Sequence, residues 1–287
     1  MVEYKIAQSV HLESLKELYS SSFSVSKSMT EHFFCNKFNQ TNCAVCLVDG
    51  EVAAALHMFD TYIFKDLKMY PVYYIYAVAT FKKFRGKGYM KSLINYSNSL
   101  ALKKGQLYSL LLPASESLYK FYEGLGYKKF FKVESLEFTY EELREIVDSK
   151  KFFVDNNLLN IEKSRSNNFC GDGDIFWNKE HIDYVISENR NCGGTTFYTE
   201  SGYAICQASD ECVDIIEFVS NNNYEDLLLK IISCFKRKKY KFRLKANLNY
   251  FEKTGVIRDF GMLKSLKEDT LKLFNLKCNP YLGLTLD

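Results

Sequence analysis

Val78-Ala-Thr-Phe-Lys-Lys-Phe-Arg-Gly-Lys-Gly-Tyr-Met90 is the stretch that decides the fold of this 287-residue chain. A β-rich run over residues 72–80 ends here, a short basic turn follows, and Gly86 and Gly88 open a predicted helix. The first N–H groups of a helix have no partner within it, and glycines let a ligand approach them closely. This order of elements favours a site that holds a phosphate on backbone N–H groups.

The helix is predicted over residues 86–104 and has clear end signals. Lys103 and Lys104 stand in its last turn, where cations are stabilised, and Gly105 suits the left-handed position that often follows a helix. Its buried stripe is predicted to consist of Met90, Leu93, Ile94, Ser97, Leu100 and Ala101.

Two common phosphate-binding loops do not fit this spacing. A P-loop requires a Lys-Ser/Thr pair, which is missing, and a dinucleotide fingerprint requires a third glycine where Lys91 stands. The string Arg85-x-x-Gly88-x-Met90 instead resembles motif A of the GNAT superfamily of N-acetyltransferases, although Met90 replaces the family's glycine or alanine. The alternative is an ordinary strand-to-helix turn with a basic face.

A second segment strengthens this resemblance. A buried strand is predicted over residues 106–112 and stops at Pro113, and a helix follows over residues 115–125, with Gly126 at its end. The helix resembles motif B of the same family, with Ser115 in place of its asparagine and Tyr122 at the position of its general acid. Leu118, Tyr119, Tyr122 and Leu125 are expected to share one buried stripe.

The resemblance implies an α/β GNAT fold, with a mixed central sheet flanked by helices. It implies direct transfer of an acetyl group from acetyl-coenzyme A to a primary amine, with Tyr122 protonating the departing sulfur. The alternative is a non-catalytic module that senses acyl-coenzyme A. The residues implied to bind the cofactor are Val78, Ala79, Thr80, Arg85, Gly86, Lys87, Gly88, Tyr89, Met90, Lys91 and Ser115.

The general base and the acceptor are not identified by any motif. No carboxylate stands in the strand 72–80, and His57, on the third strand, is a candidate base, although such histidines are more often simply hydrogen-bonded in the core. The acceptor, a small-molecule or peptide amine, is expected to lie against residues 20–38, a loop over residues 60–70 and the second domain.

The polar segment 156–174 marks the expected boundary between two domains. The prediction is an acetyl-coenzyme A-binding GNAT domain over residues 1–140, a connecting helix and linker over 141–174, and a degenerate GNAT-like α/β unit over 175–287. Where motif A would lie in the second unit, Glu225 and Asp226 stand at the helix start and would repel a pyrophosphate. This tandem order resembles acetyltransferases of the enhanced-intracellular-survival type, without their sterol-carrier-like domain.

The remaining elements of the prediction follow from hydrophobic periodicity and turn signals. In the first unit they are a helix at 11–19, a helical piece at 31–38, a hairpin of 43–48 and 51–59 across Asp49-Gly50, a strand at 128–138 and a helix at 141–147. In the second they are helices at 179–187 and 224–237, and strands at 195–199, 203–207, 212–219, 240–246 and 281–286.

Composition indicates a globular protein with room for two domains. The chain is 47% hydrophobic and 25% charged, and its net charge of +3 is too small to indicate an anionic partner. No apolar run is long enough to cross a membrane, and the first residues are unlike a signal peptide. Nine irregularly spaced cysteines then favour a reducing cytoplasm with free thiols. An oligomer is compatible with the sequence, but no feature supports one.

Two patterns that suggest other ligands have simpler structural explanations. Cys43-x-x-Cys46 is predicted to lie on a strand, where the two sulfurs point to opposite faces, so we expect buried thiols and no metal site. The run 236–245 holds seven basic residues in ten. We expect it to close a helix and then alternate along a strand, with Lys241, Arg243 and Lys245 on a charged outer face, and not to bind nucleic acid.

Overall fold

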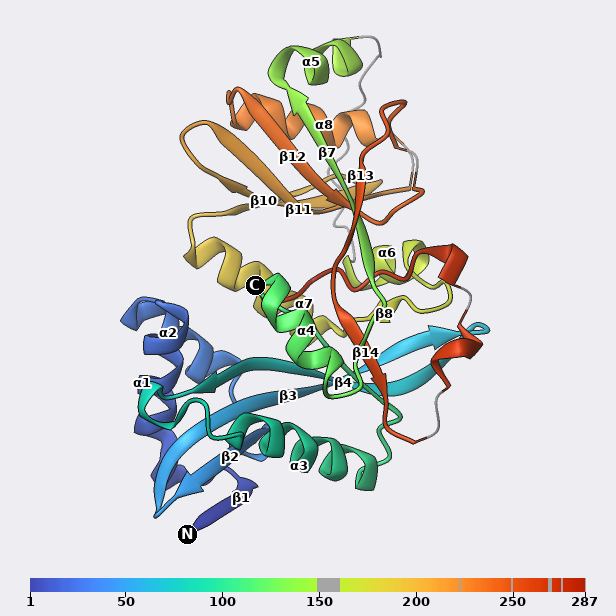
Figure 1. Cartoon of the computed structure of the whole chain (residues 1–287). Helices are drawn as coiled ribbons and strands as arrows, with labels where there is room; N and C mark the ends of the chain where they lie inside the picture. The colour runs from blue at the N-terminus through green and yellow to red at the C-terminus, as the bar shows by residue number, and fades with distance from the viewer. Residues whose placement is uncertain (149–160, 222, 249, 268–269, 275, 287) are drawn as a thin grey trace.

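The structure is a computed structural model that describes residues 1–148, 161–221, 223–248, 250–267, 270–274 and 276–286. It contains two mixed sheets, one above the other in Figure 1. The lower sheet has the order β1-β2-β3-β4-β5-β14-β6, with β8 paired to β3 outside this path, and only β4 and β5 run parallel. Its strands are β1 (Val2–Ile6), β2 (Cys43–Val48), β3 (Glu51–Lys65), β4 (Lys68–Thr80), β5 (Tyr108–Leu111), β6 (Lys128–Lys129), β8 (Ile175–Phe176) and β14 (Met262–Ser265).

Helices cover both faces of the lower sheet. One face carries α1 (Leu12–Phe23) and α2 (Lys27–Asn36), and the other carries α3 (Tyr89–Lys103) and α4 (Glu116–Glu123). Cys43 packs on the first face and Cys46 on the second, both fully buried, so the prediction of diverging buried thiols is confirmed.

The motif segments form the elements that their sequences predict, with small differences at the ends. Helix α3 begins at Tyr89, with the left-handed Gly88 as its N-cap, and buries Leu93, Ile94 and Ser97. Met90 and Leu100 are only half-buried, because they lie at the margin of the apolar stripe. In α4, Leu118 is exposed, whereas Tyr119 and Tyr122 are buried.

The upper sheet has the order β13-β7-β12-β11-β10-β9. Two helices pack on its outer face, α5 (Tyr140–Asp148) and α8 (Tyr224–Cys234), while α6 (Ile161–Asn168) and α7 (Lys179–Asn191) lie between the two sheets (Figure 1). The strands are β7 (Lys132–Thr139), β9 (Thr195–Tyr198), β10 (Gly202–Ala208), β11 (Cys212–Ser220), β12 (Lys239–Leu244) and β13 (Val256–Asp259).

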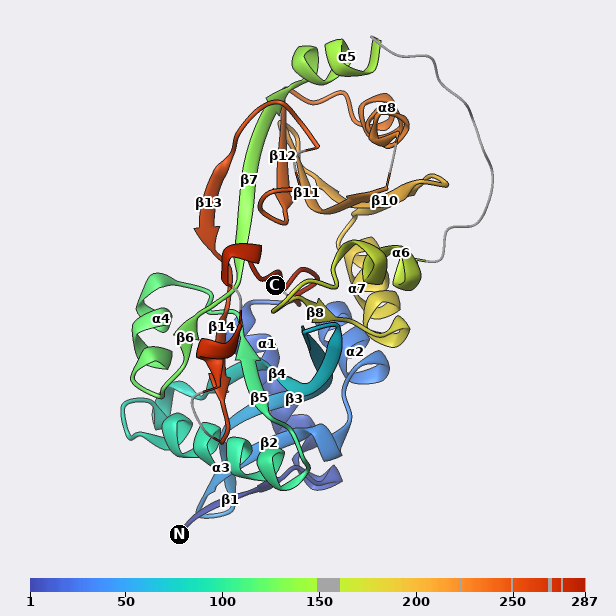
Figure 2. The same ribbon diagram turned by 90° about the vertical axis from the view of Figure 1, so that its right-hand side faces the viewer.

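Two strands cross between the halves of the chain (Figures 1 and 2). The expectation that a strand over residues 128–138 completes the first unit is wrong, because only the short β6 stays there and β7 pairs with β12 and β13 in the upper sheet. In return, β14 from the C-terminal part enters the lower sheet between β5 and β6. The sheets therefore do not follow the division expected between residues 140 and 175.

Two further expectations from the sequence are wrong. The segment 60–70 is no loop, because β3 and β4 continue as one long hairpin that turns at Asp66 and Leu67, both with positive φ. The segment 281–286 is buried but forms no strand among the described residues, because its backbone groups bond to side chains. Within the segment expected to connect the two domains, residues 161–168 form α6, while 149–160 lie outside the described residues.

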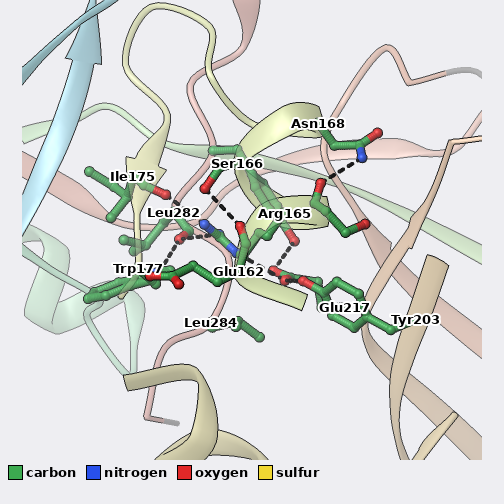
Figure 3. A network of polar contacts seen from close by, with 12 residues as sticks. Glu162, Arg165, Ser166, Asn168, Ile175, Trp177, Tyr203, Glu217, Leu282 and Leu284 are labelled. Carbon is green, nitrogen blue, oxygen red and sulfur yellow. Dashed lines mark hydrogen bonds and ion pairs between the residues drawn. The ribbon is translucent and has the colours of Figure 1, made fainter. Parts of the chain in front are cut away.

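A buried network fixes this C-terminal segment (Figure 3). The Arg165 guanidinium donates from Nε to Glu217 Oε1 at 3.1 Å and from Nη1 to the Ile175 carbonyl at 2.7 Å, and Nη2 bonds to the Leu282 carbonyl. Two tyrosine hydroxyls, from Tyr203 and Tyr281, also donate to Glu217. A buried ion pair is tolerated only when its remaining hydrogen bonds are made, as they are here.

The same segment is held at two more points. Trp177 Nε1 donates to the Leu282 carbonyl at 2.8 Å, and His181 Nε2 lies 2.8 Å from the Leu284 carbonyl oxygen. Gly283 between them has φ +71°, and a Cβ there would stand 2.2 Å from Arg165 Nη2, so only glycine fits. The network thereby places Thr285 and Leu286 at the wall of a large cavity.

Candidate active site

Strand β4 is interrupted by a bulge in the middle of the lower sheet. Ala55 pairs with Ala79 and His57 with Tyr76, so two residues of β4 lie opposite Leu56. Ala77, one of these two, has φ +50°, a left-handed conformation that is costly for a residue with a side chain. The bulge turns the backbone around Val78 out of the regular ladder.

Strands β4 and β5 separate just before the bulge. They pair in parallel from Val72 to Tyr74 of β4, whereas β5 ends at Leu111. Beyond Tyr74 no described strand pairs with β4 on its β5 side. A cavity of about 800 Å³ opens along this gap, and residues 74–78 and 111–116 line it.

The glycine turn lies at the end of the same strand. Gly86 and Gly88 have φ of +76° and +78°, and no atom lies within 4 Å of the place where a Cβ would stand on either. The backbone N–H groups of residues 86–91 donate no hydrogen bond to any described residue. Arg85 Nε donates to the Thr80 carbonyl at 2.9 Å and ties the turn to β4. Open space, outward N–H groups and a helix N-terminus fit an anionic phosphate group.

Tyr122 lines the cavity from α4. Its side chain is 5% exposed, its ring packs edge-on against Tyr127 at 5.9 Å between centroids, and its hydroxyl makes no hydrogen bond with any described residue. Burial raises the pKa of the Tyr122 phenol well above its ordinary value of 10.0. The hydroxyl thus stays protonated at neutral pH and is available as a donor to a group in the cavity.

The implied cofactor residues lie in two neighbouring places. Val78 and Ser115 line the cavity together with Tyr122. Ala79 and Thr80 follow the bulge in the β3–β4 ladder, and the segment 85–91 forms the exposed turn and the first turn of α3. Ser115 is the N-cap residue of α4, and its Oγ lies 2.9 Å from Ser117 Oγ.

The opposite walls of the cavity come from parts of the chain that carry no motif. The segment 20–38 contributes Phe23, Val25 and Met29, and the second half contributes Glu188 from α7. Tyr19 and Tyr76 complete this wall, and their hydroxyl oxygens lie 2.9 Å apart. Sequence reasoning missed these two tyrosines and Glu188, because α1, β4 and α7 are far apart in the chain. The only sequence signal for this wall is the spacing of Val185, Glu188, Asn189 and Cys192, which places their side chains on one face of a helix.

His57 is not placed to act as the base. It is 3% exposed and surrounded by the rings of Phe33, Phe34, Phe38 and Phe59, and it does not line the cavity. Burial lowers its pKa to about 3. The histidine is part of the core.

The basic run near residue 240 differs in part from the expectation. Helix α8 ends at Cys234, and β12 alternates as predicted, with Lys241 exposed and Phe242 buried. Arg243, however, is half-buried at the cavity wall, and Lys245 is buried and paired with Asp174. Two of the three cations expected on an outer face therefore point inward.

Neither a metal-binding cluster nor a membrane-spanning helix occurs among the described residues. They contain no group of three or more His, Cys, Asp or Glu side chains arranged to hold a metal ion. Among the same residues, no helix combines the length and the apolar character that crossing a bilayer requires.

Comparisons with known proteins agree with this geometry. The acetyltransferase (GNAT) domain family matches residues 3–130, and no curated protein matches the sequence. The solved GCN5-related N-acetyltransferase from Kribbella flavida is similar, with a TM-score of 0.74 at 17% identity, over 93% of this chain and 72% of that one. Eis1 from Mycobacterium abscessus gives a TM-score of 0.68 at 8% identity, over 93% and 74% of the two chains.

A tandem arrangement is also found among solved structures. The tandem GNAT protein from the clavulanic acid biosynthesis pathway has a TM-score of 0.52 at 9% identity, over 94% of this chain and the whole of that one. At such identities the likeness concerns the fold. The predicted fold, a GNAT unit followed by a second GNAT-like unit, is confirmed.

Proposed function

We propose that this protein is an acyltransferase that moves an acetyl group from acetyl-coenzyme A directly to a primary amine, because residues 3–130 match the acetyltransferase (GNAT) domain family. One observation carries the proposal. The bulge of β4, the buried hydroxyl of Tyr122 and the wall that carries Glu188 all border a single cavity. A donor thioester and an acceptor amine can therefore meet there.

The donor's place follows from the chain's own groups. The N–H groups of residues 86–91 and the exposed Arg85 and Lys87 suit its pyrophosphate, and the gap between β4 and β5 suits its extended arm. Backbone N–H groups at Val78–Thr80 would polarise the thioester carbonyl. Ser115 lines the same cavity as Tyr122 and would border the same arm.

The reaction requires one bond to form and one to break. The neutral amine attacks the carbonyl carbon, the C–N bond forms, and the C–S bond breaks. Tyr122 would give its proton to the departing sulfur, and the proton that the nitrogen loses would pass to water, from which the Tyr122 hydroxyl is restored. No covalent intermediate on the protein is needed.

We place a single donor site in the chain, at the first unit. The turn into α8 has Asn223 as its N-cap in the left-handed conformation and Glu225 and Asp226 in the first helical turn. These carboxylates already interact with the positive N-terminal end of the helix dipole and would repel a pyrophosphate.

All nine cysteines are free, which fits a protein of the reducing cytoplasm.

Gly88→Glu tests the donor site. The carboxylate would stand where the phosphates are expected, so the affinity for acetyl-coenzyme A should fall by roughly tenfold or more. Gly88→Ala is the matched control, since its methyl group enters open space and the left-handed backbone costs only about 1 kcal/mol of folding stability. Calorimetry with acetyl-coenzyme A measures both variants and the stoichiometry, which should be one per chain.

Turnover is tested with a panel of amines, including polyamines, amino acids and lysine peptides. Release of free coenzyme A that depends on the amine supports the transferase. Tight binding of the donor with no turnover on any amine would instead support the sensor module. Undiminished affinity in Gly88→Glu would remove the glycine turn as the phosphate site.

A further inference from the structure

Strand β13 forms one edge of the upper sheet, and no described strand pairs with its outer side. Figure 2 shows it as the left border of this sheet, with α4 below it. Val256 and Ile257 are 71% and 48% exposed, although edge strands are usually covered or carry charges. An open edge with apolar side chains is a surface to which a further strand can be added.

The register of β7 and β13 determines which backbone groups of β13 face outward. Lys132 lies opposite Asp259, and its N–H donates to the Pro280 carbonyl at 3.0 Å instead of to β13. Pairs with and without hydrogen bonds alternate along an antiparallel ladder. Asp259 and Ile257, two residues apart, therefore both direct their N–H and C=O groups away from β7. This is the spacing that a strand docked on the outer edge requires.

The edge of β13 leads directly into the candidate active site. Arg258, Asp259 and Phe260 line the large cavity, so the cavity wall begins one residue after Ile257. A second hollow of about 350 Å³ lies beside this edge, between Ile257 of β13 and Tyr119 of α4. A strand paired with β13 would thus pass along a hollow that can take one of its side chains and would reach the large cavity with the next residues.

A peptide fits this edge better than a second copy of the chain does. Strand β13 has four residues, and two of them face outward, whereas a stable interface between proteins usually buries about 1,200 Å² or more. A peptide acceptor needs less contact at the edge, because its amine-bearing side chain is also held in the cavity. In this mode of recognition, main-chain hydrogen bonds supply affinity and neighbouring hollows select side chains.

We propose that an extended segment of a polypeptide acceptor pairs with the outer edge of β13 and thereby presents a lysine side chain to the cavity. The N–H and C=O groups of Ile257 and Asp259 bond to the backbone of this segment, and the hollow beside α4 receives a side chain near the lysine. This inference rests on the proposed acetyl transfer and deepens it, because it names the acceptor class. The second half of the chain then holds the acceptor, while the first unit binds the donor.

Ile257→Pro tests the inference, because proline removes the outward N–H and leaves the hydrogen bonds to β7 in place. Ile257→Ala is the matched control, since it loses the same side chain and keeps the N–H. The acceptors are a β-prone peptide with blocked ends and one central lysine, and benzylamine, which has no backbone to pair. We expect the KM of the peptide to rise about tenfold in Ile257→Pro and less in Ile257→Ala. The KM of benzylamine and the affinity for acetyl-coenzyme A should stay as in wild type.

A second measurement uses the wild-type protein. N-methylation of alternate backbone nitrogens of the peptide should raise its KM in one of the two alternating patterns and not in the other, because only every second residue of a paired strand faces β13.

Equal effects of both methylation patterns, or an equal rise in the KM of peptide and benzylamine in Ile257→Pro, would overturn the pairing and leave acetyl transfer intact. Turnover of benzylamine alone would do the same, as would a wild-type dimer in sedimentation that Ile257→Pro dissociates. If wild type acetylates neither acceptor, the transfer itself fails. Fluorescence anisotropy of the labelled peptide then decides on β13, because only an affinity weakened by Ile257→Pro agrees with the inference.

Discussion

Tyr122 and Tyr119 are two tyrosines of one short helix with different surroundings. The Tyr119 hydroxyl accepts a hydrogen bond from the Gly261 N–H at 3.2 Å, whereas the Tyr122 hydroxyl bonds to no described residue and borders the cavity. A buried phenol without a hydrogen-bond partner costs free energy that a phenylalanine at the same place would not cost. Its presence at this point is consistent with a proton donor.

Tyr122→Phe should lower kcat by about a hundredfold, the usual size of a general-acid contribution, and leave the affinity for acetyl-coenzyme A unchanged. Tyr119→Phe is the matched control, and it should cost about 1 kcal/mol of stability for the lost hydrogen bond and keep its turnover. Steady-state kinetics and urea unfolding measure the two effects. Normal turnover of Tyr122→Phe with an accepted amine would make Tyr122 a core aromatic only.

At the scale of elements, the bulge of β4 is the part of the site that depends most on backbone conformation. Ala77 is buried and left-handed, and a β-branched residue is strongly disfavoured there. Ala77→Val should therefore flatten or strain the bulge, lower stability by about 1–2 kcal/mol and weaken donor binding. Ala77→Gly, which accepts this φ freely, should keep both. Donor affinity in Ala77→Val equal to that of wild type would show that the bulge conformation does not matter for binding.

The sequence could predict the elements whose signals are local. The turn at Asp49-Gly50, the glycine start of α3 and the exit at Gly105 follow from residues a few positions apart, and all have the positive φ expected. The sequence does not predict that β3 and β4 extend over residues 60–70, because the turn between them, at Asp66-Leu67, carries no glycine. The tail 281–286 alternates like a strand, but the side chains that satisfy its backbone come from α6, α7 and the residue after β8, and no local pattern reveals them.

At the scale of the whole molecule, buried histidines couple folding to pH. Burial lowers the pKa of His57 from its ordinary 6.5 to about 3, and burial lowers that of His181 to a similar value. The unfolded chain binds these protons as the pH falls below 6.5, whereas the folded chain does not until about pH 3. Each histidine therefore contributes fully to the free energy of unfolding above pH 6.5. Below this pH the contribution decreases progressively, and by pH 5 it is smaller by about 2 kcal/mol.

His57→Phe tests this coupling, since the ring joins the phenylalanines that surround the site. The difference in unfolding free energy between pH 7 and pH 5 should shrink by about 2 kcal/mol relative to wild type. The comparison of the two pH values cancels any cost of fitting the larger ring. His57→Asn should show the same smaller difference, and an unchanged difference in both variants would mean that His57 does not titrate in this range.

The cavity wall that the GNAT-like motifs mark could be located from the sequence, whereas the opposite wall could not. That opposite wall is assembled from α1, α7, β13 and the tail, and each contributes only a few side chains. Likewise, the exchange of β7 and β14 depends on pairing between strands more than a hundred residues apart. Hydrophobic alternation shows that a segment is a strand but does not show which sheet it joins.

The pairing of β14 with the lower sheet also determines when that sheet can be completed during synthesis on the ribosome. The edge of β5 is covered only when residues 262–265 pair with it, and those residues are made long after the rest of the lower sheet. At ordinary elongation speeds, the nascent chain carries this open edge for on the order of ten seconds. An unprotected edge strand invites pairing with neighbouring chains. Synthesis of this protein should therefore depend on co-translational chaperones, because its lower sheet stays incomplete until residues 262–265 have been made.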